Sequence, residues 1–340
     1  MKRWLSFHFL CHAAGLLSGL LSAPLGSAEP LQFALIAKRV DHRFFIQAGE
    51  GCAEAARTQG DTCLLLGSQG PEHFRQQNQA LEQALARDLD GIALSVTHSK
   101  WLATHALQRL DKTPLITFDS DLEPMEQHLR KGYVGLDNLA FGQQLAMLLQ
   151  RFRPQGGKLC ILTDSPQQAN HRKRIQGIRQ QLRGTQASDG GSGRLNGENG
   201  WSEPNRCPLY RAENLENAVL QLAALLHASQ IDAVISTGSW PIHEPRTYRR
   251  RLGPLLAELA ARGSAPTIVI ATNEPDTAQR ALLDDGLAQA YLGMEGREIG
   301  RQSYWMLKRL ARGEPIAREV LIDHYAIHLP GASPQFPARP

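Results

Sequence analysis

The side chains best placed to bind a small molecule lie between Leu31 and Phe45. Residues 31–37 form an apolar run with the length and composition of a buried parallel strand. Polar residues 38–43 follow, and Phe44 and Phe45 then open an amphipathic stretch. Open α/β sheets bind ligands where a strand ends and a polar loop leads into a helix. We therefore expect this loop to bind a ligand, with the rest of the chain as its scaffold and opposing wall.

The sequence carries no signature of catalysis. The loop 38–43 has no glycine, so it does not match a phosphate-cradling loop. Neither a Gly-x-Ser-x-Gly nucleophile elbow nor a His-Glu-x-x-His motif occurs. Asp119 and Arg174 could be read as an acid and an anion clamp, but no catalytic motif accompanies them. No Cys/His spacing fits zinc, so we expect neither an enzyme nor a metal or cofactor site.

Short β-rich runs alternate with helical patterns along most of the chain, which indicates an α/β protein with parallel βαβ units. A chain of 340 residues is long for one domain and suits two lobes. The expected strands are residues 31–37, 62–66, 91–95, 114–118, 133–135, 158–162, 207–210, 233–236, 267–271, 290–292 and 318–328. The expected helices are residues 44–59, 71–87, 100–110, 138–152, 167–182, 214–228, 246–262, 276–285 and 295–312.

The N-terminus has the pattern of a secretory signal peptide over residues 1–28. A basic head at residues 1–3 precedes a mostly apolar run at residues 5–21, and small residues before Glu29 suit cleavage near Ala28. The alternative is an uncleaved anchor. Without Lys2 and Arg3, the 37 basic residues become 35 against 33 acidic ones, a net charge of +2. This balance predicts no strong attraction to nucleic acid or membrane surfaces.

Export changes the interpretation of the cysteines, since disulfides form in oxidising compartments. Four cysteines follow the signal peptide, at positions 52, 63, 160 and 207, and three pairings are open to them. We favour the local pairing, Cys52–Cys63 and Cys160–Cys207, because Cys52 would lie on the first helix and Cys63 on the next strand. The alternative is four reduced, buried thiols.

Two stretches depart from the α/β pattern. Residues 184–205 carry six glycines around Trp201, and long loops of this kind are either functional or mobile. We favour a surface insertion closed by the Cys160–Cys207 bond, and the alternative is that Trp201 contacts a partner. The proline-rich tail, residues 330–340, is expected to be loose.

Several segments, in this order, carry a resemblance to a known family. They are the loop ending in Phe44-Phe45, then Leu115-Ile-Thr-Phe-Asp119, Asn170-His-Arg-Lys-Arg-Ile-Gln-Gly177, Ile231-Asp-Ala-Val-Ile235, and Ile299-Gly300 in the last long helix. Together they resemble the periplasmic sugar-binding proteins of the ribose-binding type, over residues 31–329. The resemblance implies two similar lobes with parallel sheets joined by three crossovers. The N-terminal lobe would be residues 31–134 plus 294–322, and the C-terminal lobe residues 135–293 plus 323–329.

The resemblance also implies a set of ligand-binding residues. His42 stands where the family has an asparagine, Asp119 is retained, and Ser120 replaces the arginine that follows it. Changed chemistry at several positions argues against ribose itself under this resemblance, and another sugar, a cyclitol or a sugar-derived signal is expected. The full expected set is His42, Phe44, Phe45, Asp119, Arg174, Trp240, Asn273, Met294 and Glu295.

Five of these residues also have a purely structural alternative. Phe44 and Phe45 could be a core-packing pair, Asp119 could brace a turn, and Trp240 could be an apolar plug under the hinge. Arg174 belongs to a charged run, and such runs usually lie on solvated helix faces. A sugar offers hydroxyl edges and apolar faces, which aromatic rings and planar charged groups can bind.

The function implied by the resemblance is capture of a sugar or polyol and delivery to an ABC importer, with a membrane histidine kinase or chemoreceptor as the alternative partner. We expect an exported, periplasmic monomer that binds no nucleic acid, since no helix-turn-helix precedes the first strand. A binding sugar should raise the melting temperature. Asp119→Ala or Arg174→Ala should abolish that gain and leave the melting temperature without sugar nearly unchanged.

Overall fold

The structure, a computed structural model, describes residues 29–110, 112–184, 193–210, 215–228 and 230–336. The chain divides into two units, Met1–Pro30 and Leu31–Pro340, and the fold given below is that of the second unit. The expected signal peptide, part of the glycine-rich stretch and the last four residues lie outside the described residues. No helix in the described ranges is long and apolar enough to cross a membrane.

The first sheet has six strands in the order β12-β5-β4-β3-β1-β2, and all of its neighbours pair in parallel. Residues 33–36 of the first strand are fully buried, which explains why they read as a continuous apolar run. The strands are β1 (Gln32–Ile36), β2 (Thr62–Leu66), β3 (Gly91–Leu94), β4 (Leu115–Phe118), β5 (Tyr133–Leu136) and β12 (Glu319–Ile322).

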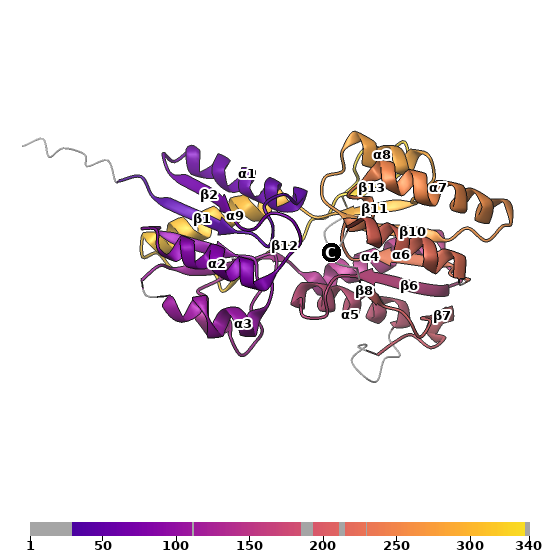
Figure 1. The fold of residues 1–340 in the computed structure, drawn as a ribbon, viewed down its shortest axis with the longest axis horizontal. Helices are drawn as coiled ribbons and strands as arrows, with labels where there is room; N and C mark the ends of the chain where they lie inside the picture. Colours follow the sequence, from indigo (N-terminus) through magenta and orange to yellow (C-terminus); the bar gives the residue numbers. More distant parts are fainter. Residues whose placement is uncertain (1–28, 111, 185–192, 211–214, 229, 337–340) are drawn as a thin grey trace, which may run out of the picture. The chain divides into compact units, whose positions relative to one another are not determined.

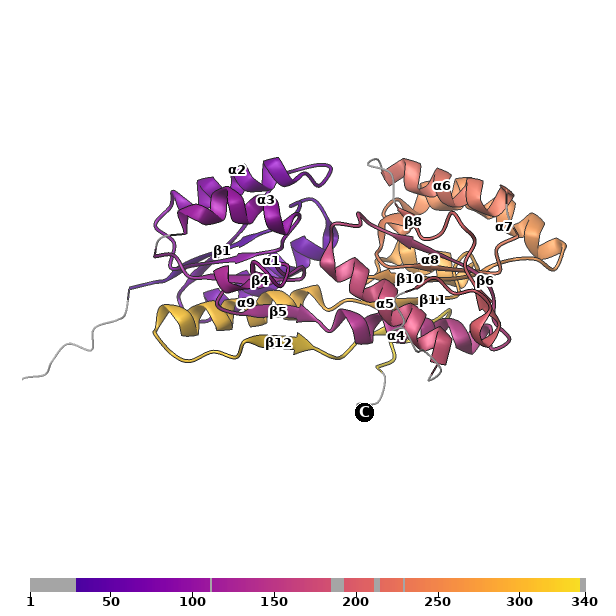
Figure 2. The same cartoon turned by 90° about the horizontal axis from the view of Figure 1, so that it is seen from below.

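Helices cover both faces of this sheet. Figures 1 and 2 show α1 (Arg43–Arg57) and α9 (Gly296–Ala311) on one face, with α2 (Phe74–Leu85) and α3 (Ser99–Thr104) on the other. The helices α1 and α9 approach closely because Gly300 has no side chain: a Cβ there would collide with the Ala48 carbonyl. The aliphatic faces of both helix pairs bury against the sheet, as amphipathic helices must.

The second sheet follows the order β13-β11-β10-β9-β6-β7, and β8 also pairs with β6. Its described pairings are parallel except for that of the last strand, which runs antiparallel to β11. The strands are β6 (Gly157–Thr163), β7 (Trp201–Ser202), β8 (Leu209–Tyr210), β9 (Ala233–Ser236), β10 (Thr267–Thr272), β11 (Ala290–Gly293) and β13 (Ile327–His328).

Helices α4 (Asn138–Phe152) and α5 (Ala169–Arg183) cover one face of the second sheet, as Figure 2 shows. Helices α6 (Leu215–Ala228), α7 (Pro245–Ala261) and α8 (Thr277–Asp284) pack in a separate apolar cluster on the other face. Gly142 of α4 lets α5 approach, because a Cβ at this position would collide with the Arg174 carbonyl. The turn of α5 that carries Arg174 is therefore packed directly against the backbone of α4.

The chain passes between the two sheets three times: from β5 to α4, from β11 to α9, and from β12 to β13. We call β1–β5, α1–α3, α9 and β12 the N-terminal lobe, and the remaining elements the C-terminal lobe. The expected boundary after residue 134 is two residues early, because Gly135 and Leu136 pair with β12 in the first sheet.

Three expected elements differ from the structure. The single strand 318–328 is two strands in different sheets, since residues 323–326 cross between the lobes. The helix 100–110 breaks at His105, where the α-helix gives way to a 3-10 turn, η1 (Ala106–Arg109). The described part of the tail is tied down rather than loose, because Ile327 and Gln335 exchange two backbone hydrogen bonds.

The cysteines form the local pairing, Cys52–Cys63 and Cys160–Cys207. The first bond ties α1 to the neighbouring strand β2, and the second ties β6 to the end of the glycine-rich stretch. Trp201 is only 1% exposed and packs in the core as part of β7. The suggestion that Trp201 contacts a partner is therefore wrong, because its ring is used for packing.

Candidate ligand-binding site

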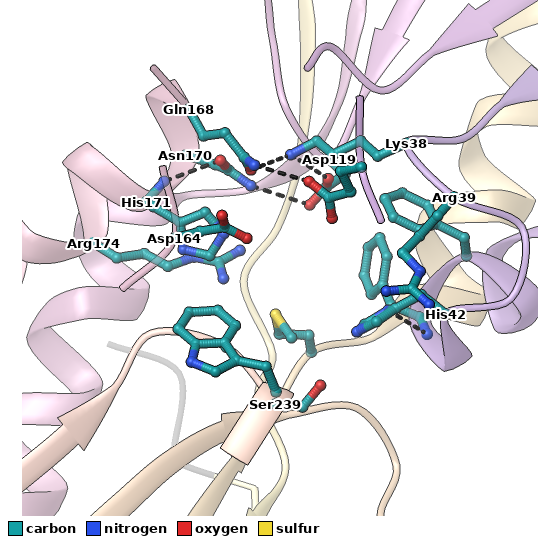
Figure 3. A pocket seen from close by; sticks show the side chains of 16 residues that line it. Lys38, Arg39, His42, Asp119, Asp164, Gln168, Asn170, His171, Arg174 and Ser239 are labelled. Atoms are coloured by element: carbon teal, nitrogen blue, oxygen red, sulfur yellow. Dashed lines mark hydrogen bonds and ion pairs between the residues drawn. The ribbon is translucent and has the colours of Figure 1, made fainter. Parts of the chain in front are cut away.

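A pocket lies where the loops at the carboxyl ends of strands from both lobes meet (Figure 3). In the N-terminal lobe, the loop after β1 and the start of α1 contribute Lys38, Arg39, His42, Phe44 and Phe45, and two further loops contribute Glu72 and Asp119. In the C-terminal lobe, the loop after β6 and the start of α5 contribute Asp164, Gln168, Asn170, His171 and Arg174. The loop after β9 contributes Gly238, Ser239 and Trp240, and a crossover contributes Met294.

The loop after β1 places two cations in the pocket wall. Lys38 is 2% exposed, and its Nζ lies 3.6 Å from Asp119 Oδ2. Arg39 is 7% exposed and donates from Nε and Nη2 to the two carboxylate oxygens of Asp41, each at 2.7 Å. This bidentate pair lowers the pKa of Asp41. Both cations therefore face the pocket with a carboxylate already beside them.

Asp119 follows β4 in a left-handed backbone conformation, with φ of 57°. Aspartate tolerates this region better than most residues. Its Oδ2 accepts from Ser95 Oγ at 2.8 Å, its Oδ1 lies 3.4 Å from the donor Asn170 Nδ2, and its carbonyl accepts from the Tyr133 hydroxyl at 3.0 Å. Burial raises the pKa of Tyr133, which keeps its hydroxyl protonated as a donor. Asp119 thus lines the pocket and also braces its own turn.

Arg174 brings a buried guanidinium to the pocket from α5. Its side chain is 2% exposed, and its Nε donates to Asn138 Oδ1 at 2.8 Å while its Nη1 donates to the Thr237 carbonyl at 2.7 Å. The guanidinium carbon lies 5.0 Å from the centre of the Phe141 ring. Burial lowers the pKa of Arg174, and the charge of Asp119 opposes that shift. Among the described residues, Arg174 forms no ion pair within 4.0 Å, so neutral groups hold its charge in place.

Aromatic rings line the pocket from both lobes. Phe44 and Phe45 meet edge to face at 5.1 Å, and Phe45 packs on Phe118 in the same way at 6.1 Å. Trp240 stands on the opposite wall, with its ring 5.6 Å from that of His171. The two phenylalanines are each 4% exposed and belong to the hydrophobic core as well as to the pocket wall. The core-packing and pocket-lining interpretations of this pair therefore both apply.

The expected site residues divide into two groups in the structure. His42, which caps α1 by accepting from the Phe44 amide, lines the pocket together with six others: Phe44, Phe45, Asp119, Arg174, Trp240 and Met294. Asn273 and Glu295 are not among the lining residues. Asn273 is buried, and its side-chain oxygen has no hydrogen-bond partner within the part of the chain that the structure describes. Glu295 is half-buried at the start of α9, where burial raises its pKa.

Sequence reasoning missed several lining residues, chiefly Lys38, Arg39, Glu72, Gln168 and Asn170. His171 belongs to the charged run 171–174, for which the sequence predicts a solvated helix face, yet it is buried. A helical-face argument could have found it, because residues 170, 171 and 174 share one face of α5 while Arg172 and Lys173 are exposed. The described residues contain no cluster of three or more His, Cys, Asp or Glu side chains that could hold a metal ion.

Comparison with known proteins agrees with this geometry. A sequence family described as a periplasmic binding protein domain matches residues 33–315. No curated protein matches the sequence. The chain belongs to the periplasmic binding protein family, and its two lobes with mostly parallel sheets form the type I fold of that family.

Three solved structures illustrate the likeness. An ABC transporter solute-binding protein from Agrobacterium vitis, bound with α-D-tagatopyranose, is 16% identical with a TM-score of 0.73, over 88% of this chain and 94% of the other. GanP, a glucose-galactose binding protein from Geobacillus stearothermophilus, is 18% identical with a TM-score of 0.68, over 89% and 98%. The XylFII-LytSN complex includes a chain that is 17% identical with a TM-score of 0.65, over 88% and 98%. At these identities the likeness establishes the fold.

Proposed function

We propose that this protein is an exported solute-binding protein that captures a sugar or sugar-like polyol between its lobes and delivers it to an ABC importer. The observation that carries the proposal is the position of Arg174: a buried guanidinium in a pocket whose aromatic walls come from both lobes. Export through the signal peptide, with cleavage near Ala28, would place the mature protein in the periplasm. We expect the mature protein to be a monomer.

The chemistry of the pocket suits a polyol. The rings of Phe44, Phe45 and Trp240 offer flat apolar surfaces for the C–H faces of a sugar. Carboxylates, amides and guanidinium groups around them offer both donors and acceptors, which a hydroxyl needs because it is both at once. Closure of the two lobes on such a ligand would trap it and create a new surface for a membrane partner.

The relatives support the sugar class without fixing the ligand. One related protein was solved with α-D-tagatopyranose, and another is described as a glucose-galactose binding protein. In this chain, the chemistry around Asp119 and His42 departs from the ribose-binding pattern, so we do not propose ribose. We propose no enzymatic activity and no cofactor, because the pocket chemistry described above serves binding.

A second function is a ligand sensor that presents the bound sugar to a membrane histidine kinase or chemoreceptor. The observation in its favour is the XylFII-LytSN complex, in which a protein of the same fold is found with a second protein. Lobe closure would be the same for both functions. An importer operon beside the gene would favour transport, whereas an adjacent kinase gene would favour sensing.

The proposal is tested by the melting temperature of the mature chain in a panel of pentoses, hexoses, cyclitols and their acids. A ligand that binds only the folded protein stabilises it by about 2.7 kcal/mol at a hundred times its Kd. At least one member of the panel should raise the melting temperature, with saturation at one equivalent by calorimetry. No shift with any member would reject the sugar-binding proposal.

A further inference from the structure

A single side chain of the C-terminal lobe holds two residues of the N-terminal lobe. Gln168, at the start of α5, accepts from Lys38 Nζ through Oε1 at 2.6 Å and donates from Nε2 to Glu72 Oε2 at 2.9 Å. Figure 3 shows the Gln168 side chain reaching across to Lys38. Gln168 is only 5% exposed, so both contacts are made largely out of solvent.

The chemistry of these three groups fixes the orientation of the amide. A lysine ammonium only donates and an ionised glutamate only accepts, so the carbonyl of Gln168 must face Lys38 and its NH2 must face Glu72. No other uncharged side chain of this reach offers an acceptor and donors on one planar group. Gln168 therefore joins two oppositely charged residues of the other lobe without adding a charge of its own.

This contact also sets polar geometry inside the pocket. The Lys38 ammonium held by Gln168 is the same group that lies 3.6 Å from Asp119 Oδ2. Two residues further along the chain, Asn170 Nδ2 approaches Asp119 Oδ1 at 3.4 Å. The start of α5 thus positions both the cation and the carboxylate of the N-terminal wall.

Apart from the buried Asn170–Asp119 contact at 3.4 Å, two further lobe-to-lobe contacts start from exposed side chains. Arg172 pairs with Glu123, and Arg43 donates to the Glu274 carbonyl at 3.1 Å. The side chains of Arg172 and Arg43 are 44% and 43% exposed. Exposed ion pairs contribute little because water competes for them and salt screens them. We expect the Gln168 contacts to dominate, because they are buried and, at 2.6 and 2.9 Å, shorter than the Asn170–Asp119 contact.

We propose that Gln168 is a positioning residue. Its hydrogen bonds to Lys38 and Glu72 favour the arrangement in which the two lobes are in contact, even when no ligand is bound. Apparent affinity falls in proportion to the fraction of molecules in the binding-competent arrangement. Loss of Gln168 should therefore separate the lobes and weaken ligand binding, both because fewer molecules are in the binding arrangement and because Lys38 loses its partner. The ligand part of this inference rests on the proposed function, whereas the effect on the lobes does not.

The first test measures the distance between the lobes directly. The four cysteines after the signal peptide are in disulfides, so spin labels can be attached at Lys100→Cys and Arg246→Cys, both exposed. Gln168→Ala should shift the distance distribution measured without sugar toward longer distances and weaken binding of a panel sugar that binds the wild type roughly tenfold. Gln167→Ala, at the exposed neighbouring position, should change neither. An unchanged distribution in Gln168→Ala would overturn the proposal.

The second test separates positioning from general support of the fold. Gln168→Glu keeps an acceptor for Lys38 but places a carboxylate against Glu72, so the lobes should separate. Adding Glu72→Gln restores a donor–acceptor pair with its polarity reversed, and the wild-type distance distribution should return. A double variant as open as Gln168→Glu would contradict the proposal. If no sugar binds, the proposed function fails, while the distance measurements without sugar still decide the role of Gln168.

Discussion

The Arg174 guanidinium rests on the side chain of Asn138, with Nε donating to Oδ1 at 2.8 Å. Asn138 is the first residue of α4, directly after the chain crosses from β5 into the C-terminal lobe. The residue expected to bind the ligand is thus anchored to the hinge. We therefore expect movement of the hinge to change the orientation of the guanidinium.

Arg174→Ala should abolish stabilisation by sugar and also lower the melting temperature of the protein without sugar. The second effect differs from the expectation based on sequence, because the substitution leaves the buried acceptors on Asn138 and Thr237 without their donor. Leaving buried acceptors unpaired costs about 1–3 kcal/mol of unfolding free energy. Urea denaturation and a sugar titration measure the two effects separately. Lys173→Ala, at the exposed neighbouring position, is the control and should change neither.

Binding should change the fluorescence of Trp240. The ring lines the pocket and is 7% exposed, so a sugar placed against it changes its surroundings. Trp240→Phe should remove most of the emission change on titration with a binding sugar. Trp101→Phe, on α3 and outside the pocket lining, should retain it. The same loss in both variants would show that the signal does not come from the pocket.

Gly142→Ala should destabilise the protein and weaken sugar binding together. The added methyl would press on the Arg174 carbonyl and move α5 away from α4. Overpacking of this kind costs about 1–3 kcal/mol. Gly253→Ala in α7 is the matched control, because its Cβ would meet only Leu287 at 4.0 Å. Pro254 follows Gly253 and disfavours a helical alanine before it, so no gain in stability is expected, and sugar binding should be unchanged.

Acid should weaken the fold through His328. This side chain is 3% exposed, and neither ring nitrogen has a hydrogen-bond partner among the described residues. Burial first, and then the charge of Arg280, lower its pKa from 6.5 to about 4, while Glu274 opposes the shift. The unfolded chain therefore takes up the proton first as the pH falls. Stability present at pH 7 is lost between pH 6.5 and 4.

The loss through His328 should reach about 2 kcal/mol between pH 7 and pH 5. Urea denaturation at the two pH values measures it, and His328→Leu, which cannot titrate, should show a difference smaller by that amount. Glu295 works in the opposite direction, because burial raises the pKa of its carboxyl and its protonation favours the folded state. An equal pH dependence in wild type and His328→Leu would contradict this account of His328.

The parallel sheets could be predicted from sequence because most strands are buried on both faces. Expected and observed bounds coincide for β2 (Thr62–Leu66), β9 (Ala233–Ser236) and α4 (Asn138–Phe152). The segment 318–328 was predicted as one strand because it contains no Gly or Pro that would mark a break. The crossover from one sheet to the other depends on tertiary packing, which no local pattern shows. The break at the end of α3 also has no Gly or Pro to mark it in the sequence.

The site was only partly predictable, for a physical reason. Seven of the nine expected residues line the pocket, and all but Arg174, which lies in the second turn of α5, follow strand ends or start helices. Lys38 and Gln168 were missed because their contact joins positions 130 residues apart, and no local pattern encodes such a pair. Asn273 was expected from its place after a strand, yet its side chain is buried outside the pocket-lining set.

Amide hydrogen exchange with and without a binding sugar tests the central claim most directly. A ligand held between the lobes should slow exchange in both lobes at once, at residues 38–45 of the N-terminal lobe and at residues 168–174 and 238–240 of the C-terminal lobe. Protection confined to one lobe, or located away from these segments, would contradict a binding site formed where the two lobes meet.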